Sequence, residues 1–258
     1  MDISVVIITK NEAHIIGKTL QSLQAVAHDI VIVDSGSTDE TVAIGKQYNA
    51  TVIETGWSGY GINKNKGIQA SKYDWILSLD ADEAIDETLA ESLKQLRPAN
   101  EEEVFDIRFK NFFCNKWIRF GEWGFDRHIR LFNRKKVQWN NSAVHEELIF
   151  PAGFTKKRLK GNILHYTVHD KKEYAVKMNN YAMMNAEKYF KARKRSNFGK
   201  AYFSPVFSFL QHYIFRLGFL DGPEGLLIAR TTARYTFLKY HYLNEMNKNN
   251  NTAITKET

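Results

Sequence analysis

The first hundred residues alternate short apolar runs with segments of helical periodicity, and this alternation narrows the possible folds most. The sequence predicts strands at Ile3–Thr9, Ile30–Asp34, Thr51–Glu54 and Trp75–Leu79, and the apolar runs predict that the first, second and fourth of them are buried. Helical spacing predicts helices over residues 14–26, 41–48, 60–71 and 86–96. Strands that alternate with helices through short connections form parallel sheets. We therefore expect an α/β protein with a Rossmann-like, mostly parallel central sheet flanked by helices.

The pattern changes after Asn100–Glu103, a charged stretch with few apolar residues. Shorter strands are predicted at residues 105–109, 129–132 and 162–166, where they extend the same sheet and build the second wall of a cleft. From Asp170 onward the spacing is helical, which predicts a C-terminal helical extension. The expected organisation is a catalytic domain over residues 1–168, a helical region over 169–246 and a disordered tail over 247–258.

Charge is distributed unevenly along the 258 residues. Residues 1–100 carry 14 acidic and 8 basic side chains, a net charge of −6, whereas residues 101–258 carry 15 acidic and 28 basic, a net charge of +13. A basic, aromatic-rich second half favours an anionic partner such as a phospholipid surface, a phosphorylated substrate or nucleic acid.

The sequence also bears on the compartment. Cys114 is the only cysteine, so no internal disulfide can form, in keeping with a reducing compartment. The amino-terminal residues lack the pattern of a signal peptide. The most apolar long stretch, 201–220, is interrupted by Pro205, Gln211, His212 and Arg216, so we expect no transmembrane span and a cytoplasmic protein.

Asp80 and Asp82 follow the fourth predicted strand directly. Side chains at positions i and i+2 of extended backbone project to the same side, so both carboxylates are expected to approach one divalent cation. Mg²⁺ or Mn²⁺ favours carboxylate, water and phosphate oxygens. The alternative is that these are two solvated acids that cap the following helix.

Three further polar segments follow predicted strands or enter a helix. Thr9–Glu12 and Asp34–Asp39 stand at the carboxyl ends of strands, where parallel α/β sheets bind ligands, and Lys64 precedes Gly67 in a helix. Asp34 could accept from a nucleobase or ribose, and Lys64 could neutralise a diphosphate. Each segment also has a structural interpretation: a loop at the N-terminus of a helix for Thr9–Glu12, a helix-capping turn for Asp34–Asp39 and a solvated helix face for Lys64.

Together these motifs resemble the family 2 glycosyltransferases, whose nucleotide-sugar domain is called GT-A. The resemblance rests on residues 7–12, 31–39, 64–67 and 79–82, which read IITKNE, VIVDSGSTD, KNKG and LDAD. It implies that Thr9, Glu12, Asp34 and Lys64 contact the nucleotide of a UDP-sugar. It also implies that Asp82 binds Mg²⁺ or Mn²⁺ on the diphosphate and that Asp80 assists.

Later motifs look like the bacterial lipopolysaccharide inner-core β-1,4-glucosyltransferases of this family. They are Gly121–Asp126 with Arg130–Phe132, Val144–Glu146 and Gly218–Gly222. Direct inverting transfer needs a base near the acceptor hydroxyl. Many relatives supply it from an acidic pair, and this chain has His145-Glu146-Glu147 instead.

Glu146 is the leading candidate for the base and Asp126 the alternative. His145 could ligate the metal, orient the acceptor or be a buried structural histidine. Arg130 would anchor a phosphate or carboxylate in bidentate fashion, unless it is a strand residue paired with an acid. His165 and His169 are further candidates to bind the metal or the acceptor, but their spacing carries little signal, so they are interpreted as structural.

The C-terminal helices carry an aromatic stripe with Lys and Arg nearby, which favours peripheral contact with an anionic membrane over complete burial in a core or dimer. The Gln-x-x-Arg-Trp signature of processive synthases is absent, so transfer of a single sugar is expected.

The resemblance implies an inverting, metal-dependent transfer of one hexose, glucose from UDP-glucose, to a lipid-linked saccharide such as the lipopolysaccharide inner core. The place of action implied is the cytoplasmic face of the inner membrane, with no nucleic acid as partner. Alternatives are another cell-envelope or protein acceptor, a non-catalytic saccharide- or membrane-binding module on the same fold, and a nucleotidyltransferase.

Overall fold

A computed structural model describes residues 1–141, 146–196 and 198–254 of the chain. The chain divides into two compact units, residues 1–110 with 126–165, and residues 111–125 with 166–258. The strands, in chain order, are β1 Ile3–Thr9, β2 Asp29–Asp34, β3 Thr51–Glu54, β4 Trp75–Asp80, β5 Glu83–Ile85, β6 Glu103–Phe113, β7 Lys116–Trp117, β8 Arg127–Asn133, β9 Gln138–Trp139, β10 Leu148–Ile149 and β11 Thr155–Val168. The helices are α1 Ile16–Leu23, α2 Thr41–Gln47, α3 Tyr60–Ala70, α4 Glu87–Gln95, α5 Lys171–Lys191, α6 Phe198–Phe209, the π-helix η1 Leu210–Phe215, the 3₁₀-helix η2 Gly218–Asp221 and α7 Gly222–Ile254.

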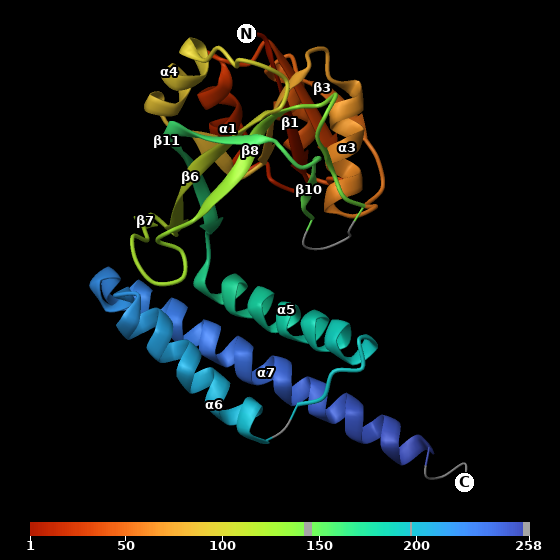
Figure 1. The fold of residues 1–258 in the computed structure, drawn as a ribbon, viewed down its shortest axis with the longest axis vertical. Helices are drawn as coiled ribbons and strands as arrows, with labels where there is room; N and C mark the ends of the chain where they lie inside the picture. The colour runs from red at the N-terminus through yellow and green to blue at the C-terminus, as the bar shows by residue number, and fades with distance from the viewer. Residues whose placement is uncertain (142–145, 197, 255–258) are drawn as a thin grey trace. The chain divides into compact units, whose positions relative to one another are not determined.

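The central sheet confirms the expected α/β class and is mixed in direction. Its strand order is β3-β2-β1-β4-β8-β6-β11-β5, with β7 paired to β6 (Figure 1). The strands β3, β2, β1 and β4 pair in parallel, because helices connect them in sequence. From β8 onward the assigned pairings are antiparallel. The expected helical extension after Asp170 is confirmed as α5 to α7.

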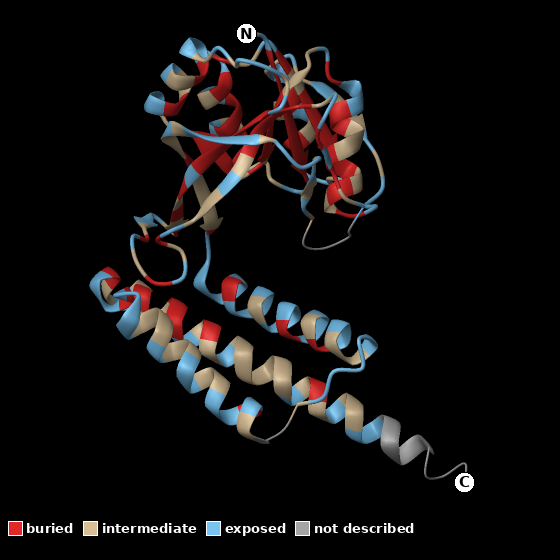
Figure 2. Ribbon diagram, in the orientation of Figure 1, coloured by how far each residue is buried: buried red, intermediate tan, exposed pale blue. Residues whose placement is uncertain are grey.

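The core of the first unit forms on both faces of β1, β2 and β4, whose residues are mostly buried (Figure 2), whereas β3 at the edge of the sheet has no buried residue. On one face Ile16, Leu20 and Leu23 of α1 pack against the sheet, as their helical spacing predicts. On the other face α3 lies so close that a Cβ on Gly67 would stand 2.4 Å from Val6 Cγ1. Glycine at this position therefore lets the helix that carries Lys64 approach β1.

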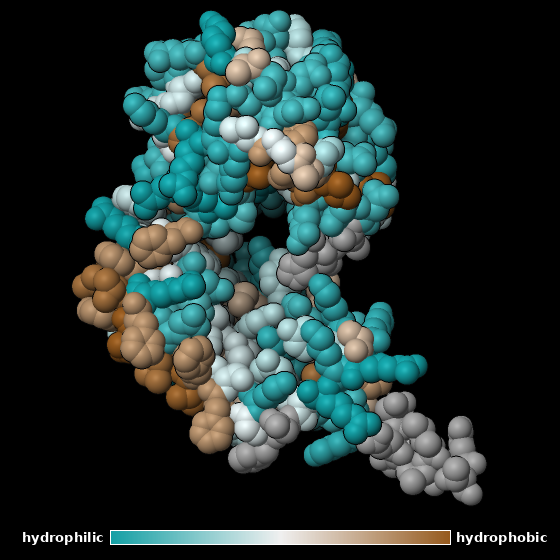
Figure 3. All heavy atoms as spheres, in the orientation of Figure 1, coloured by the Kyte–Doolittle hydropathy of each residue, from teal (hydrophilic) through white to brown (hydrophobic). Residues whose placement is uncertain are grey.

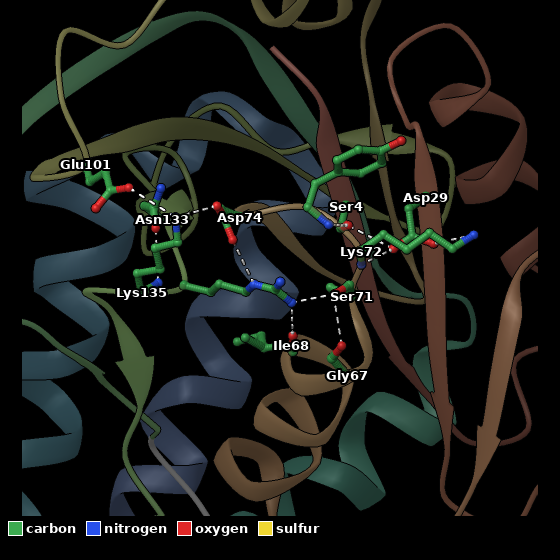
Figure 4. Close-up of polar contacts among 12 residues, drawn as sticks. Ser4, Asp29, Gly67, Ile68, Ser71, Lys72, Asp74, Glu101, Asn133 and Lys135 are labelled. Atoms are coloured by element: carbon green, nitrogen blue, oxygen red, sulfur yellow. Dashed lines mark hydrogen bonds and ion pairs between the residues drawn. The ribbon is translucent and has the colours of Figure 1, made fainter.

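A polar network holds the amino ends of these strands, opposite the ends at which ligands bind in such sheets (Figure 4). The Asp29 carboxylate accepts from Ser4 Oγ at 2.8 Å and from the Lys72 backbone N–H at 2.9 Å. Arg134 donates to the backbone carbonyls of Ile68 and Ser71 and pairs with Asp74. These bonds fix the end of α3 to the start of β4, so the two elements that carry Lys64 and Asp80 have a defined spacing.

The second unit has its own apolar core, formed by Phe113, Ile118, Val168, Tyr174 and Ile228. In this unit α7 packs against both α5 and α6 (Figure 1). None of the helices in the described part of the chain is long and apolar enough to cross a membrane.

The Gly218–Gly222 motif has a structural role in this second unit. The buried Asp221 carboxylate accepts from the backbone N–H groups of Arg119 and Phe120, at 3.1 and 2.8 Å, and so fixes the 111–125 segment. A Cβ on Gly225 would lie 2.0 Å from the Gly218 carbonyl oxygen, so glycine is required where these segments cross.

The expectation of a disordered tail from residue 247 is wrong as far as Ile254, because α7 continues to that residue. Extending an existing helix adds one hydrogen bond per residue without a new nucleation cost, so a polar sequence can follow a stable helix. Residues 255–258 lie outside the described part.

Candidate active site

The expected ligand-binding ends of the parallel strands lie next to one another. In the register of β1 with its neighbours, Thr9 is opposite Asp34 of β2, and Ile8 is opposite Asp80 of β4. Three of the residues predicted from separate motifs therefore meet at one edge of the sheet, as expected for parallel strands.

Lys64 is the centre of the charged cluster at this edge. Its side chain is only 1% exposed, and its Nζ lies 3.2 Å from Asp80 Oδ1 and 2.7 Å from Glu146 Oε1. The ammonium group also stands 4.6 Å from the centre of the Trp139 ring, within the range of a cation–π contact. A buried ammonium group needs such partners, because desolvation otherwise disfavours its charge. The alternative reading of Lys64 as part of a solvated helix face is wrong.

The local sequence explains how α3 reaches these partners. Asn65 Nδ2 donates to the Trp139 carbonyl at 2.8 Å, and the Trp139 N–H donates to Asn65 Oδ1 at 3.1 Å. A Cβ on Gly61 would stand 1.8 Å from the Asn140 carbonyl oxygen, so only glycine permits this close approach. The helix and β9 are thus joined directly beside Lys64.

Arg130 of β8 supplies a second buried cation. Its guanidinium lies 2.6 Å from Glu83 Oε1 and 3.7 Å from Asp80 Oδ2, and it stacks over Phe109 at 5.2 Å. The other oxygen of Glu83 accepts from the Asp80 backbone N–H at 3.0 Å. Arg130 is therefore a strand residue paired with acids, the structural alternative considered for it above.

The pKa values of the two acids beside Arg130 move in opposite directions. Burial alone would raise the pKa of Asp80, but the nearby charges of Lys64 and Arg130 outweigh it and lower that pKa to about 2. Glu83 is more deeply buried than Asp80, and its burial raises its pKa in spite of the Arg130 charge. Asp80 is thus the more firmly ionised of the pair.

Asp82 lies apart from Asp80 in a turn. The strand β4 ends at Asp80, so the prediction that both carboxylates project from continuous extended backbone is wrong. Asp82 Oδ2 instead lies 3.4 Å from His165 Nε2. Burial alone would lower the pKa of His165, but the Asp82 carboxylate outweighs it and raises that pKa.

These residues fit a hard divalent cation that takes its remaining ligands from a substrate. Within the described residues, no three His, Cys, Asp or Glu side chains are grouped closely enough to hold a metal by themselves. Mg²⁺ and Mn²⁺ sites of this kind use one or two carboxylates plus phosphate and water oxygens. Asp80 is engaged by the two cations Lys64 and Arg130, whereas Asp82 is paired with the imidazole of His165, so Asp82 is the better placed ligand.

Asp126 lies just before β8, and its Oδ1 is 2.6 Å from His128 Nε2. The ring of His128 packs edge-on against Phe109, the residue over which Arg130 stacks. Burial alone would lower the pKa of Arg130, but acids led by Glu83 and Asp80, and including Glu146 and Asp126, together raise it. Asp126 and Glu146, the two candidate bases, therefore both stand close enough to act electrostatically on Arg130.

The residues expected to bind the nucleotide differ in their surroundings. Asp34 is buried and accepts from the backbone N–H groups of Gly36 and Ser37 and from the Ser37 hydroxyl, so its oxygens hold the turn that follows β2. Thr9 Oγ1 and Asn63 Oδ1 are buried, and neither has a hydrogen-bond partner among the described residues. Glu12 is half-buried, and its backbone N–H donates to Thr41 Oγ1 at 2.8 Å. His145 lies outside the described residues.

Three residues of the cluster were missed as site residues in the sequence analysis: Glu83, Trp139 and His165. His165 is opposite Glu83 in the antiparallel pairing of β11 with β5, more than eighty positions away in the chain. Only Glu83 had a local signal that could have identified it as a site residue. It is an acid followed directly by the apolar residues Ala84 and Ile85, a pattern that indicates a buried carboxylate.

Comparison with known proteins agrees with this geometry. The model of the family described as glycosyl transferase family 2 matches residues 4–160. The chain is also 32% identical over 249 residues to the lipopolysaccharide core biosynthesis glycosyltransferase LpsC of Rhizobium meliloti, covering 92% of this chain and 90% of that protein. The chain belongs to glycosyl transferase family 2. It is therefore a glycosyltransferase, as predicted.

Other similar proteins are more distant. An uncharacterized glycosyltransferase of Rickettsia prowazekii is 27% identical, over 99% of this chain and 91% of that protein. Among solved structures, residues 1–349 of TarS from S. aureus, in complex with UDP-GlcNAc, align with a TM-score of 0.45 and 16% identity, covering 97% of this chain and 92% of that one. Against a longer TarS chain the match covers 55% of that protein.

The geometry of this glycosyltransferase predicts that Arg130 is needed for stability. Arg130→Met should lower the free energy of unfolding by about 3 kcal/mol, because Glu83 and Asp80 would keep buried negative charge without their partner. Urea unfolding followed by tryptophan fluorescence measures the change. Arg108→Met, at an exposed position on the neighbouring strand β6, is the matched control. Equal unfolding midpoints for the two variants would contradict this account of the cluster.

Proposed function

We propose that this family 2 glycosyltransferase transfers one glucose from UDP-glucose, with inversion, to a lipid-linked saccharide such as the lipopolysaccharide inner core. The observation that carries the proposal is the buried Lys64 ammonium, held between Asp80 and Glu146 at the edge of the sheet where Thr9 and Asp34 end their strands. The fixed Lys64 ammonium could neutralise a diphosphate leaving group, and the acids of the turn after β4 could hold a metal ion on the same diphosphate. The choice of glucose and of the acceptor follows the resemblance to inner-core glucosyltransferases and the LpsC relative.

The donor would lie across the ends of β1, β2 and β4. Thr9 Oγ1 and Asn63 Oδ1 are buried polar atoms without a hydrogen-bond partner in the described part of the chain, and such atoms are expected to meet a bound group. Glu12 would accept from the nucleotide nearby. Asp34 would shape the loop against which the nucleotide binds, since its oxygens already accept from Gly36 and Ser37.

Charge on the departing diphosphate would be neutralised at two places. Lys64 would exchange its contact with Glu146 for a phosphate oxygen while it keeps Asp80. Asp82, with His165 beside it and Asp80 assisting, would hold Mg²⁺ or Mn²⁺, which supplies Lewis-acid stabilisation of the leaving group. Fixed charges of this kind act most strongly where water is excluded.

The acceptor base must stand on the side of the sugar opposite the leaving diphosphate. Glu146 contacts Lys64 directly, so it stands on the diphosphate side if Lys64 binds there. Asp126 is paired instead with His128, at 2.6 Å. The geometry therefore favours Asp126 as the base over Glu146. His128 would orient the Asp126 carboxylate toward the hydroxyl.

The acceptor side is argued from charge and from the relatives. The net charge of +13 over residues 101–258 suits an anionic lipid surface, so we propose that the enzyme acts as a peripheral protein on the cytoplasmic face of the inner membrane. The missing Gln-x-x-Arg-Trp signature supports transfer of a single sugar. Another cell-envelope or protein acceptor is the alternative.

A panel of nucleotide sugars, with and without Mn²⁺, tests the donor and the metal. We expect hydrolysis of UDP-glucose only when the metal is present, and a loss of at least about 100-fold in Asp82→Asn, because a main electrostatic contact to the leaving group is removed. Asp74→Asn, at the opposite ends of the strands, is the control. The mechanism would be contradicted if Asp82→Asn kept full activity. It would also be contradicted if the wild type hydrolysed UDP-glucose equally fast with Mn²⁺ and with a chelator.

Comparing two isosteric variants tests the base. Asp126→Asn should lower kcat for transfer about 10²- to 10⁴-fold and leave the affinity for UDP unchanged. Glu146→Gln should instead change the affinity for the donor, since Glu146 competes with phosphate for Lys64. Steady-state kinetics together with UDP titration separate the two effects. The opposite pattern, with kcat lost only in Glu146→Gln, would assign the base to Glu146.

A further inference from the structure

The second unit exposes a row of large apolar side chains along α6, η1 and η2, which we call the α6 face. Figure 3 shows brown side chains gathered over these elements. On α6 and η1 the stripe repeats at helical spacing, with Phe203, Val206, Phe207, Leu210 and Ile214 on one side. The exposed members are Tyr202, Phe203, Val206, Phe207, Leu210, Ile214, Phe215, Leu217, Phe219 and Leu220.

This face is not part of the unit's own core. Ala201 is the buried residue on the opposite side of α6, and α6 packs against α7. Phe203 and Phe215 are 73% and 72% exposed, so the described residues leave most of each aromatic side chain uncovered. Continuous apolar surface on this scale marks an interaction site in a soluble protein.

Charge identifies the kind of partner. Residues 191–220 contain six basic and no acidic side chains. Arg195, Lys200 and Arg216 are exposed within this segment. A second copy of the same face would bring like charges together, which is unfavourable. An anionic lipid surface would accept both the apolar stripe and the basic side chains.

We propose that the α6 face inserts in the plane of an anionic phospholipid bilayer, with its aromatic side chains at the level of the headgroups and its basic side chains on lipid phosphates. Helices of this type bury their apolar face about 5–10 Å into the interface. The choice of lipid as occupant rests on the proposed function, in which the acceptor is lipid-linked. The α6 face is then the surface through which the enzyme contacts the membrane, and this contact requires negatively charged lipid.

Flotation of the full chain with vesicles tests the inference. The wild type should bind vesicles that contain phosphatidylglycerol and bind pure phosphatidylcholine vesicles at least about tenfold more weakly. The triple variant Phe203→Ser/Phe207→Ser/Phe215→Ser should lose binding to both. Arg195→Gln/Lys200→Gln/Arg216→Gln should bind anionic vesicles at least about tenfold more weakly, because three lipid contacts are removed. Val176→Ser, at an exposed apolar position on α5, is the matched control and should bind as the wild type does.

Hydrolysis of UDP-glucose without vesicles, measured on the same variants, separates this inference from the proposed function. The α6-face variants should hydrolyse the donor at the wild-type rate, which also shows that they are folded. Wild-type vesicle binding by the triple serine variant would overturn the inference, whatever the donor assay shows. A wild-type dimer that dissociates in the triple variant, without vesicle binding by either protein, would assign the face to a second copy and equally overturn it.

Discussion

The arrangement of the site depends on one buried charge, the ammonium group of Lys64. An ammonium group removed from water is stable only among acids, and Asp80 and Glu146 supply them within 3.2 Å. These three residues come from α3, from the end of β4 and from the segment before β10. The enclosure of Lys64 also requires α3 to lie close to its neighbours. Gly61 and Asn65 let the helix approach the β9 segment, and Gly67 lets it approach β1.

A second charge pair separates the roles of the two aspartates. Arg130 neutralises Glu83 and also lies near Asp80, so together with Lys64 it leaves Asp80 ionised and fully engaged. Asp82, two residues further on, is paired with the titratable imidazole of His165. In the proposed site, Asp82 would therefore be the main ligand of the cation, and Asp80, already paired with Lys64 and Arg130, would assist.

Local patterns in the sequence predicted the parallel half of the sheet, since buried strands and amphipathic helices each have their own periodicity. They also predicted that Thr9, Asp34 and Asp80 would meet, because parallel strands align their carboxyl ends. The pairing of Asp82 with His165 could not be predicted, because it depends on the antiparallel register of β5 with β11. The contact of Glu146 with Lys64 could not be predicted either, because the two residues are 82 positions apart in the chain. Long-range pairing of this kind has no local signal.

Titration of UDP and of uridine into the Mn²⁺-loaded enzyme tests the role of Lys64 most directly. Lys64→Met should weaken UDP binding at least about tenfold and leave uridine binding unchanged, because only UDP carries the diphosphate. Lys66→Met, two positions along the same helix, is the matched control and should bind both ligands as the wild type does. Wild-type affinity of Lys64→Met for UDP would contradict the account, and so would an equal loss of UDP and uridine binding.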